Sequence, residues 1–437
     1  MQEQLLIYTP TITPRVKYVF SLFFETLINT PYNLTTDTAE YKNHQGAKIN
    51  YSNQPIEEGE IFISANSLLF EDDIRSQVIT VTEWEKLKIF YQADAGVLPF
   101  DLFAASFYLV SRYEEYLLSS LDDHDRFRHT GSLAFKNKFI DVPIVNLWAN
   151  KLKDILKKKY PELEIKENNY VFTPTIDIDV AYAHKGRKLK IILGSYFRAL
   201  FRLDFSYAID KKLTLLGLKK DNFDTYNYQR DIFKKFNVRP VYFFLAGNWG
   251  KHDRNINTEG KYFQALVKKV SEYAYIGIHP SYRSGGSVAI VEQEIKRVEK
   301  NLTEKITKSR QHFLKITLPE TYRCLAELGI TDDYTMVFAA CPGFRASICT
   351  PFFFYDLRRE TPLPVKLHPT VFMEGTFSEY MQVKPEEAIV ITRELIERVK
   401  QCKGEFVSIW HNDTLNNKGK WKGWRKVFEA MLETGTK

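Results

Sequence analysis

Two acidic residues with the spacing to share a metal ion lie in the stretch Thr173-Pro-Thr-Ile-Asp177-Ile-Asp179-Val. They follow an apolar segment with the character of a β-strand, and residues two apart on a strand point to the same face. Two carboxylates held close together repel each other unless a cation lies between them. The pair therefore fits one carboxylate bound to a metal ion and the other acting as a base, although a strand-ending turn with two solvated acids has the same pattern.

Two histidines later in the chain also end apolar, strand-like segments. His279 ends Tyr275-Ile-Gly-Ile-His279, and His411 follows Glu405-Phe-Val-Ser-Ile-Trp410. In an α/β sheet or barrel the carboxyl ends of the parallel strands meet at one edge, where active sites form. A single histidine at a strand end is more often structural than a ligand, but three polar clusters of this kind in one half of the chain indicate a common site.

An arginine occupies a similar position. Arg345 stands in Pro342-Gly-Phe-Arg345-Ala, shortly after the strand-like segment 335–340. A guanidinium group stays charged and forms two parallel hydrogen bonds to a carboxylate. We therefore expect Arg345 to hold Asp177 in its ionised form.

The elements that must position these residues alternate between strand and helix from residue 169 onward. Apolar runs predict strands over 170–173, 241–245, 275–279, 335–340 and 405–410, and helical spacing of apolar residues predicts helices over 226–236, 262–273, 289–302, 319–328 and 385–402. This alternation predicts an α/β fold of parallel units that closes into a distorted β/α barrel.

The apolar pattern of the first half predicts a smaller α/β domain over residues 1–168, which precedes the barrel at 169–437. Strands are expected over 5–8, 60–65 and 78–81, and helices over 16–27, 100–118 and 143–158. A mostly polar stretch over 162–169 marks the boundary. Two domains also agree with the length of 437 residues, which is more than one ordinary core accommodates.

The composition is that of a globular protein, with 44% hydrophobic and 26% charged residues and a net charge of +7. The densest basic stretch, 185–202, fits either an amphipathic helix on an anionic surface or a solvated helix face. No nucleic-acid-binding motif accompanies it, and no apolar run reaches the roughly 18 residues that span a membrane. The first 14 residues lack the features of a secretory signal, so we expect a cytoplasmic protein acting on a cytoplasmic sugar precursor.

In this order, the segments resemble the polysaccharide deacetylases of carbohydrate esterase family 4, also called the nodulation-protein homology domain. Asp177 and Asp179 look like the opening acidic pair of that family, and His279 resembles the first histidine of its second motif. Arg345 looks like the arginine of the third motif and His411 like the late histidine. The resemblance implies a β/α barrel, a carbohydrate substrate and a divalent metal ion, most often zinc.

The exact sequences of some motifs resemble a narrower group of proteins. Arg310-Gln-His312, Gly343-Phe-Arg345 and Trp410-His411-Asn412 resemble a bacterial branch of deacetylase-like proteins with an uncharacterised N-terminal domain. The stretches 100–103, 111–115 and 125–127 look like that N-terminal domain. The resemblance thus extends over nearly the whole chain, but it assigns no role to the first half.

One residue departs from the family pattern. The usual second motif has another metal-binding histidine four residues after the first, and Arg283 stands there instead. A guanidinium has no free lone pair and cannot bind a metal ion. With Asp179 and His279 as two implied ligands, the third could come from His312 or His184. We favour His312, because His184 belongs to a basic stretch that is expected to be helical.

The resemblance implies hydrolysis of an N-acetyl group, or alternatively an O-acetyl group, on a carbohydrate. The metal ion would polarise the carbonyl group and activate a water molecule. Asp177, positioned by Arg345, would take the proton of that water, and His411 would donate a proton to the leaving amine.

Three other interpretations remain open at this point. A pair of carboxylates could hydrolyse a glycosidic bond without a metal, although glycosidase acids usually come from different elements. A non-catalytic, glycan-binding descendant of the deacetylase fold could have lost its metal, with Arg283 paired to Asp179 or bound to an anionic sugar group. Finally, the polar clusters 112–115 and 125–127 could make the first half the functional part, although salt bridges between the domains are the preferred explanation for them.

Overall fold

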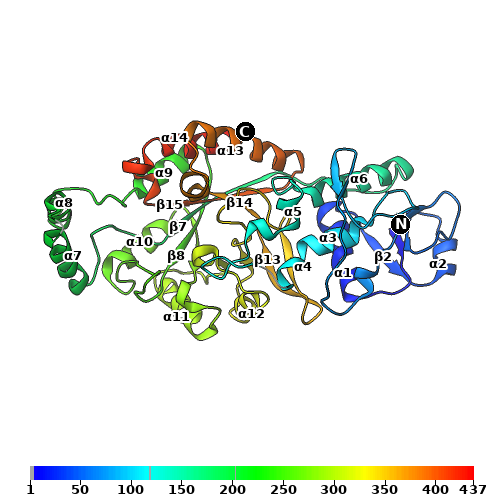
Figure 1. Cartoon of the computed structure of the whole chain (residues 1–437), viewed down its shortest axis with the longest axis horizontal. Helices are drawn as coiled ribbons and strands as arrows, with labels where there is room; N and C mark the ends of the chain where they lie inside the picture. The colour runs from blue at the N-terminus through cyan, green and yellow to red at the C-terminus, as the bar shows by residue number, and fades with distance from the viewer. Residues whose placement is uncertain (1–3, 118–119, 202) are drawn as a thin grey trace.

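The computed structural model describes residues 4–117, 120–201 and 203–437. Its two main sheets consist mostly of parallel strands and lie side by side along the longest axis of the molecule (Figure 1). The smaller sheet has four parallel strands in the order β2-β1-β3-β4. Its strands are β1 (Leu5–Tyr8), β2 (Tyr32–Thr35), β3 (Lys48–Ser52) and β4 (Ile61–Ser64). A two-stranded antiparallel ribbon, β5 (Thr82–Trp84) and β6 (Leu87–Ile89), follows it.

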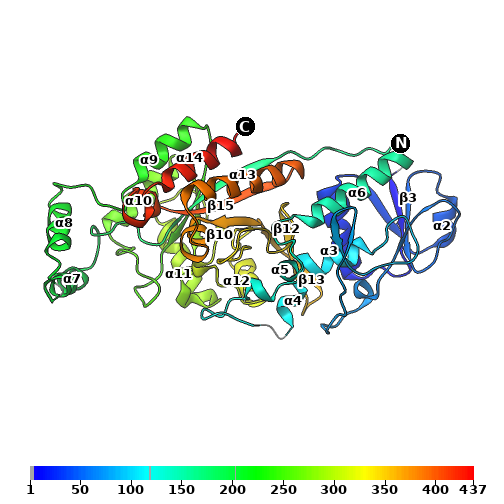
Figure 2. The ribbon, with the colours of Figure 1, turned by 45° about the horizontal axis from the view of Figure 1, so that its top comes forward.

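The main helices of the first half are α1, α3 and α6, which pack on the small sheet (Figure 2). Their local sequences explain where they begin: the Thr13 hydroxyl accepts the N–H of Val16 ahead of α1, and the Asp101 carboxylate caps α3. The helices are α1 (Pro14–Phe20), continued by a π-helical stretch (Ser21–Leu27), α2 (Thr38–Asn43), α3 (Leu102–Val110), α4 (Tyr113–Tyr116), α5 (Leu133–Lys136) and α6 (Ile144–Lys159).

The larger sheet has nine strands in the order β12-β13-β11-β10-β9-β8-β7-β15-β14. All neighbours in it are parallel except β12 and β13. The strands are β7 (Val171–Ile178), β8 (Val241–Leu245), β9 (Tyr275–His279), β10 (Lys308–Ser309), β11 (Asp332–Asp333), β12 (Phe352–Asp356), β13 (Thr361–Leu367), β14 (Thr370–Met373) and β15 (Glu405–His411).

The larger sheet curls until its β14 edge meets the segment that follows β11. The N–H of Thr370 donates to the carbonyl of Met336 at 3.1 Å, and the N–H of Gly343 donates to the carbonyl of Val371 at 2.8 Å. Seven parallel strands therefore enclose a common core, with β13 and β12 as an extension outside the ring. This arrangement is a distorted β/α barrel, which confirms the predicted fold class.

Helices connect the strands of the barrel and cover its outer surface. They are α9 (Tyr226–Lys235), α10 (Lys261–Ser271), α11 (Val288–Glu299), α12 (Glu320–Glu327), α13 (Pro385–Gln401) and α14 (Trp424–Gly435). Two more helices, α7 (Leu189–Phe201) and α8 (Phe205–Leu215), form a hairpin that projects from the end of the barrel farthest from the small sheet (Figures 1 and 2). No helix among the described residues is long and apolar enough to cross a bilayer.

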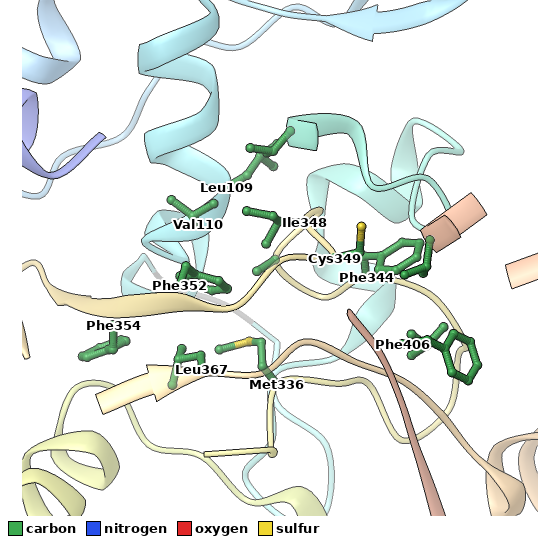
Figure 3. Close-up of a cluster of buried hydrophobic side chains, with 14 of the residues drawn as sticks. Leu109, Val110, Met336, Phe344, Ile348, Cys349, Phe352, Phe354, Leu367 and Phe406 are labelled. Carbon is green, nitrogen blue, oxygen red and sulfur yellow. The ribbon is translucent and has the colours of Figure 1, made fainter. Parts of the chain in front are cut away.

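The two halves of the chain share one buried apolar core. Leu109 and Val110 of α3 lie against Ile348 and Phe352 of the barrel (Figure 3). The backbone N–H of Phe344 also donates to the carbonyl of Ile140, a residue of the first half, at 2.7 Å. The small sheet ends at residue 64 and β7 begins at residue 171, so the expected boundary after residue 168 remains a prediction.

Two predicted strands are wrong. Residues 78–81 form no strand: Val78 is 94% exposed, while Ile79 and Val81 pack against the core from a segment that belongs to no sheet. Residues 335–340 are buried but irregular, because the backbone there turns back on itself, with Val337 donating to the carbonyl of Thr335. The last residue of the predicted helix 100–118 and the last residue of the basic stretch 185–202 lie outside the described residues.

Candidate metal centre

The carboxyl ends of β7, β9 and β15 bring the predicted residues together at one mouth of the barrel. His411 pairs in register with Asp177, and His279 lies two strands away, next to Leu245 of β8. A cavity of about 270 Å³ opens above these strand ends. It is lined by acidic, imidazole and aromatic side chains, including Asp177, Asp179, His279, His312, Phe313, Glu374, Tyr380, His411, Asp413 and Trp421.

Asp179, His279 and His312 form a compact group of possible metal ligands. One ligand atom from each of the three lies within 4.8 Å of the others. The Nε2 atom of His279 is 3.2 Å from Asp179 Oδ1, and that of His312 is 3.4 Å from Asp179 Oδ2. His312 reaches the group from the short 3₁₀ turn that follows β10. The structure therefore brings together the three residues that the sequence suggested as metal ligands.

Hydrogen bonds to the far side of each imidazole turn its Nε2 atom toward Asp179. His279 Nδ1 lies against the backbone carbonyl of Arg310, and His312 Nδ1 is 2.9 Å from Asp253 Oδ1. Asp253 is itself fixed by the backbone N–H of Tyr282. Supporting partners of this kind set the tautomer and ring orientation of metal-binding histidines.

The carboxylates of the group shift the pKa values of its members. Burial favours the neutral form of His312, but the carboxylates of Asp179 and Asp253 outweigh it and raise the pKa of His312 to about 9. Burial likewise opposes the charge on Asp179, yet His312 and His411 hold the pKa of Asp179 well below its usual range. The cluster therefore attracts positive charge, which protons on the imidazoles or a bound cation supply.

The donor atoms fit a divalent metal ion. With its Nδ1 atom against the carbonyl of Arg310, His279 presents Nε2 to Asp179 Oδ1 at 3.2 Å, and in the neutral ring this Nε2 has a lone pair for a metal ion. That carboxylate oxygen is buried and forms no hydrogen bond. A cation between the two atoms satisfies both, and two imidazole nitrogens with one carboxylate oxygen are a ligand set typical of zinc.

A buried arginine orients Asp177, the other carboxylate of the pair. Arg310 Nη1 donates to Asp177 Oδ1 at 2.8 Å, and both side chains are almost fully buried. Arg310 also donates from Nε to the carbonyl of Tyr334 at 3.0 Å and lies over the ring of Phe243. These contacts leave Asp177 Oδ2 facing the cluster, 3.8 Å from His279 Nε2.

His411 also approaches Asp179, with its Nε2 atom 3.6 Å from Oδ2, the oxygen that His312 approaches too. The Nδ1 atom of His411 is 2.7 Å from Glu374 Oε1, a fully buried carboxylate that also accepts the backbone N–H of His411. Burial opposes a charged ring, but Glu374 and Asp179 outweigh it and raise the pKa of His411. Near neutral pH this imidazole is therefore held as a proton donor. Burial also raises the pKa of the neighbouring Asp413 to about 6.

A second cavity of about 270 Å³ continues from the first toward the N-terminal half. Arg126, Leu314 and Tyr380 line both cavities. Arg126 is tied to Asp122 at 2.7 Å and donates to the carbonyl of Phe313 at 2.9 Å. The outer wall comes from residues 122–130, so the first half of the chain supplies part of the groove.

Comparison with known proteins gives one match to a sequence family and several distant similarities of structure. Residues 5–161 match a family described as "Family of unknown function (DUF7033)". That match covers the first half alone and assigns no activity to it. No curated protein matches the chain.

The similar solved structures are related to deacetylases. A candidate polysaccharide deacetylase from Mycobacterium smegmatis aligns over 61% of this chain and 85% of its own, with 14% identity and a TM-score of 0.39. A polysaccharide deacetylase from Bacillus cereus aligns over 60% and 85%, with 11% identity and a TM-score of 0.29. A CE4 family pseudoenzyme from Bacillus anthracis aligns over 62% and 63%, with 11% identity and a TM-score of 0.30. Because these scores are low, the chemistry of the site must rest on its own side chains.

The predicted position of Arg345 is wrong. Arg345 forms two hydrogen bonds to Glu115, at 2.9 and 2.6 Å, and does not contact Asp177. Arg310 holds Asp177 instead. Arg345 follows the irregular segment 335–340 and lies beneath α4, where Glu115 is the nearest carboxylate. The polar cluster 112–115 of the first half therefore forms salt bridges between the halves, as the preferred explanation predicted.

The structure also separates the remaining candidates. His184 lies outside the cavity, 3.3 Å from Asp210 at the base of the α7–α8 hairpin. The side chain of Arg283 is exposed, and the ion-pair partners of Asp179 among the described residues are His279, His312 and His411.

Sequence reasoning missed three residues that orient the site: Arg310, Asp253 and Glu374. Glu374 follows the apolar strand β14 and precedes a glycine, so the same strand-end rule could have found it. Arg310 follows a strand of two residues, which is too short to leave a pattern. Asp253 lies in a polar loop with no distinguishing signal.

Proposed function

We propose that this protein is a metal-dependent hydrolase that removes acetyl groups, preferably N-acetyl groups, from a carbohydrate. The observation that carries the proposal is the buried group of Asp179, His279 and His312, placed between a carboxylate held by Arg310 and an imidazole held by Glu374. A divalent metal ion bound there, with zinc as the best match to the ligands, would polarise the acetyl carbonyl group and lower the pKa of a water molecule.

The side chains around the cluster suit the two proton transfers that amide hydrolysis requires. Asp177 presents Oδ2 to the cluster and accepts a proton from the attacking water as its oxygen adds to the acetyl carbon. His411, kept protonated by Glu374, gives its proton to the nitrogen as the carbon–nitrogen bond breaks. Acetate and a free amine are the products.

The groove suits a sugar chain better than a compact substrate. Phe313, Tyr380 and Trp421 line the first cavity with aromatic surface, and the second cavity extends it past Arg126. Aromatic faces offer broad apolar contact area for the faces of sugar rings, and the surrounding polar groups can bind hydroxyl groups. The acetylated sugar would occupy the first cavity and a neighbouring sugar the second.

Metal content of the purified protein is the first test. We expect about one tightly bound ion per chain, by elemental analysis after incubation with zinc. His279→Ala and His312→Ala should each lose it. The matched control is His184→Ala, which removes a buried histidine outside the cavity and should retain the metal ion.

Acetate release from N-acetylated oligosaccharides is the second test. Asp177→Asn should keep the metal ion and lose most of the activity, because an amide cannot take the proton. The exposed Asp123→Asn is the control and should match the wild type. A chain that binds glycans but no zinc, cobalt or nickel would instead be a non-catalytic descendant of this fold, and the proposal would be wrong.

A further inference from the structure

The α7–α8 hairpin (residues 189–215) is an insertion in the connection that follows β7, the strand whose end carries the acidic pair of the site. It projects from the barrel at the end opposite the small sheet (Figures 1 and 2). Its base is closed by Asp221, whose carboxylate accepts the backbone N–H groups of Ala183, His184 and Lys185. The hairpin is thus a defined element with an anchored base.

The surface between the two helices is polar. The ammonium group of Lys211 is almost fully buried there, where it donates to the hydroxyl of Ser195 and to the carbonyl of Ile192. Thr214 is buried beside it, and the ring of Tyr196 lies 4.8 Å from the Lys211 ammonium. A helical hairpin that is stable in water normally buries its large apolar residues between the helices, whereas in this one Lys211 and Thr214 are more deeply buried than any of its large apolar side chains that the structure describes.

The outward surface of the hairpin is apolar. Phe197 is 64% exposed and Phe201 is 86% exposed. Of the 23 large apolar side chains that are exposed among the described residues, 11 lie between residues 189 and 218. They are Leu189, Leu193, Phe197, Phe201, Leu203, Phe205, Tyr207, Ile209, Leu215, Leu216 and Leu218. The spacing of four in α7 places its members on one face. So many exposed apolar side chains on one projecting element mark a site of interaction with another protein or a membrane.

The same segment holds the positive charge of the chain. Ten Lys or Arg and two Asp occur between residues 185 and 220, a net charge of +8, while the whole chain carries +7, so the remaining residues sum to −1. Exposed cations lie on the two helices (Lys190, Arg198 and Lys212) and directly next to them in sequence (Lys188, Lys219 and Lys220). Exposed aromatic and aliphatic side chains together with cations match the boundary between acyl chains and anionic headgroups.

We propose that the α7–α8 hairpin docks on the surface of a bilayer that contains anionic phospholipids, with its apolar face in the acyl boundary and its cations among the headgroups. With 13 residues, α7 is about 20 Å long, shorter than the roughly 30 Å hydrocarbon core, so the hairpin lies in the interface and does not span it. Pairing with a second copy would bring two segments of +8 together, which like-charge repulsion opposes.

The experiment is sedimentation of the full-length protein with vesicles of phosphatidylcholine, with and without phosphatidylglycerol. We expect binding that requires the anionic lipid and weakens several-fold as salt rises from about 0.1 to about 0.5 M. Phe197→Glu with Phe201→Glu should reduce binding at least about tenfold, because two exposed rings no longer enter the acyl boundary. Lys188→Glu with Lys190→Glu should reduce the binding to anionic vesicles.

The matched control is Val390→Glu, which places an acid at an exposed apolar position of α13 and should leave binding unchanged. Thermal stability and metal content of each variant show whether it is folded. The proposal is overturned if wild-type protein does not bind anionic vesicles, or if the folded Phe197→Glu/Phe201→Glu variant binds them as well as wild type. It is also overturned if the apolar face instead mediates lipid-independent dimers, seen by light scattering and abolished by the same variant.

Discussion

Replacing Arg345 by Met removes a buried guanidinium that joins the two halves of the chain. Arg345 and Glu115 have side-chain exposures of 3% and 5%, and their two hydrogen bonds measure 2.9 and 2.6 Å. After the substitution, Arg112, at 2.8 Å, is the remaining ion-pair partner of Glu115. The substitution therefore leaves the buried Glu115 carboxylate paired with one guanidinium group in place of two.

The cost can be worked out from the electrostatics of Glu115. Burial alone would raise the pKa of this carboxyl group, but Arg345 and Arg112 outweigh it and lower the pKa from 4.5 to about 2. A difference of about 2.5 in pKa corresponds to about 3 kcal/mol. Because the folded-state pKa is the lower one, this stabilisation is present above pH 4.5 and is lost as the pH falls toward 2. Breaking a buried pair costs a similar amount, about 3–5 kcal/mol, so we expect Arg345→Met to lower the free energy of unfolding by about 3 kcal/mol at pH 7.

Urea unfolding followed by tryptophan fluorescence measures this change. The matched control is Arg358→Met, which breaks the pair between Arg358 and Glu320, at 2.7 Å, where both side chains are about half exposed. An exposed pair contributes at most about 1 kcal/mol, so the control should unfold close to the wild type. The metal content of folded Arg345→Met, and its rate of acetate release at saturating substrate, should be those of the wild type, because Arg345 does not contact Asp177.

Two results would refute this reasoning. If Arg345→Met costs no more than Arg358→Met, the buried pair with Glu115 does not stabilise the joined halves. If Arg345→Met unfolds normally but releases acetate much more slowly, then Arg345 acts on the site, as the sequence analysis first predicted.

Three further outcomes are expected. His368 is buried between Glu405 and Asp332, which outweigh burial and raise its pKa from 6.5 to about 9. Its charged form contributes about 3 kcal/mol to the free energy of unfolding, and this contribution is complete below pH 6.5 and lost as the pH rises through 9. The unfolding temperature should therefore fall over this pH range, and His368→Gln should make it depend less on pH. Asp253→Asn should weaken zinc binding about 10–100-fold in a competition with a chelator, because it weakens the support of a metal-binding imidazole; unchanged affinity would remove Asp253 from the site. A fragment that begins at Asn169 should aggregate on expression, because it exposes apolar surface that the first half covers; a soluble, folded fragment would contradict the shared core.

Long apolar strands were predictable from the sequence, and so were the residues at their ends. The bounds predicted for β8 and β9 agree with the structure, because uninterrupted apolar runs between polar turns leave little choice of register. The rule that strand ends converge then brought Asp177, Asp179, His279 and His411 together. Strands β10 and β11 have two residues each and left no periodic signal.

The sequence alone does not show whether Arg310 or Arg345 holds Asp177. Arg310 and Arg345 both follow elements of the barrel, and each is fully charged and able to hold a carboxylate. A contact in the folded structure distinguishes them, because Glu115 of the first half, more than 200 residues away in sequence, lies beside Arg345. His312 was favoured because Arg283 excluded the usual position and few histidines remained, and the structure places it beside Asp179 and His279.

The groove beside the metal centre has a wall from each half of the chain, since residues 122–130 face the barrel across Arg126. In the proposed function, the bond to be cleaved would meet side chains of the barrel, while the neighbouring sugar would meet residues 122–130 as well as barrel residues such as Phe338 and Tyr380. Residues 122–130 would then contribute to recognition without supplying a proton-transferring group. Substitutions in 122–130 would change which polymer binds and leave the proton-transferring groups in place. Related chains with the same barrel residues would then differ in substrate while the reaction stays the same.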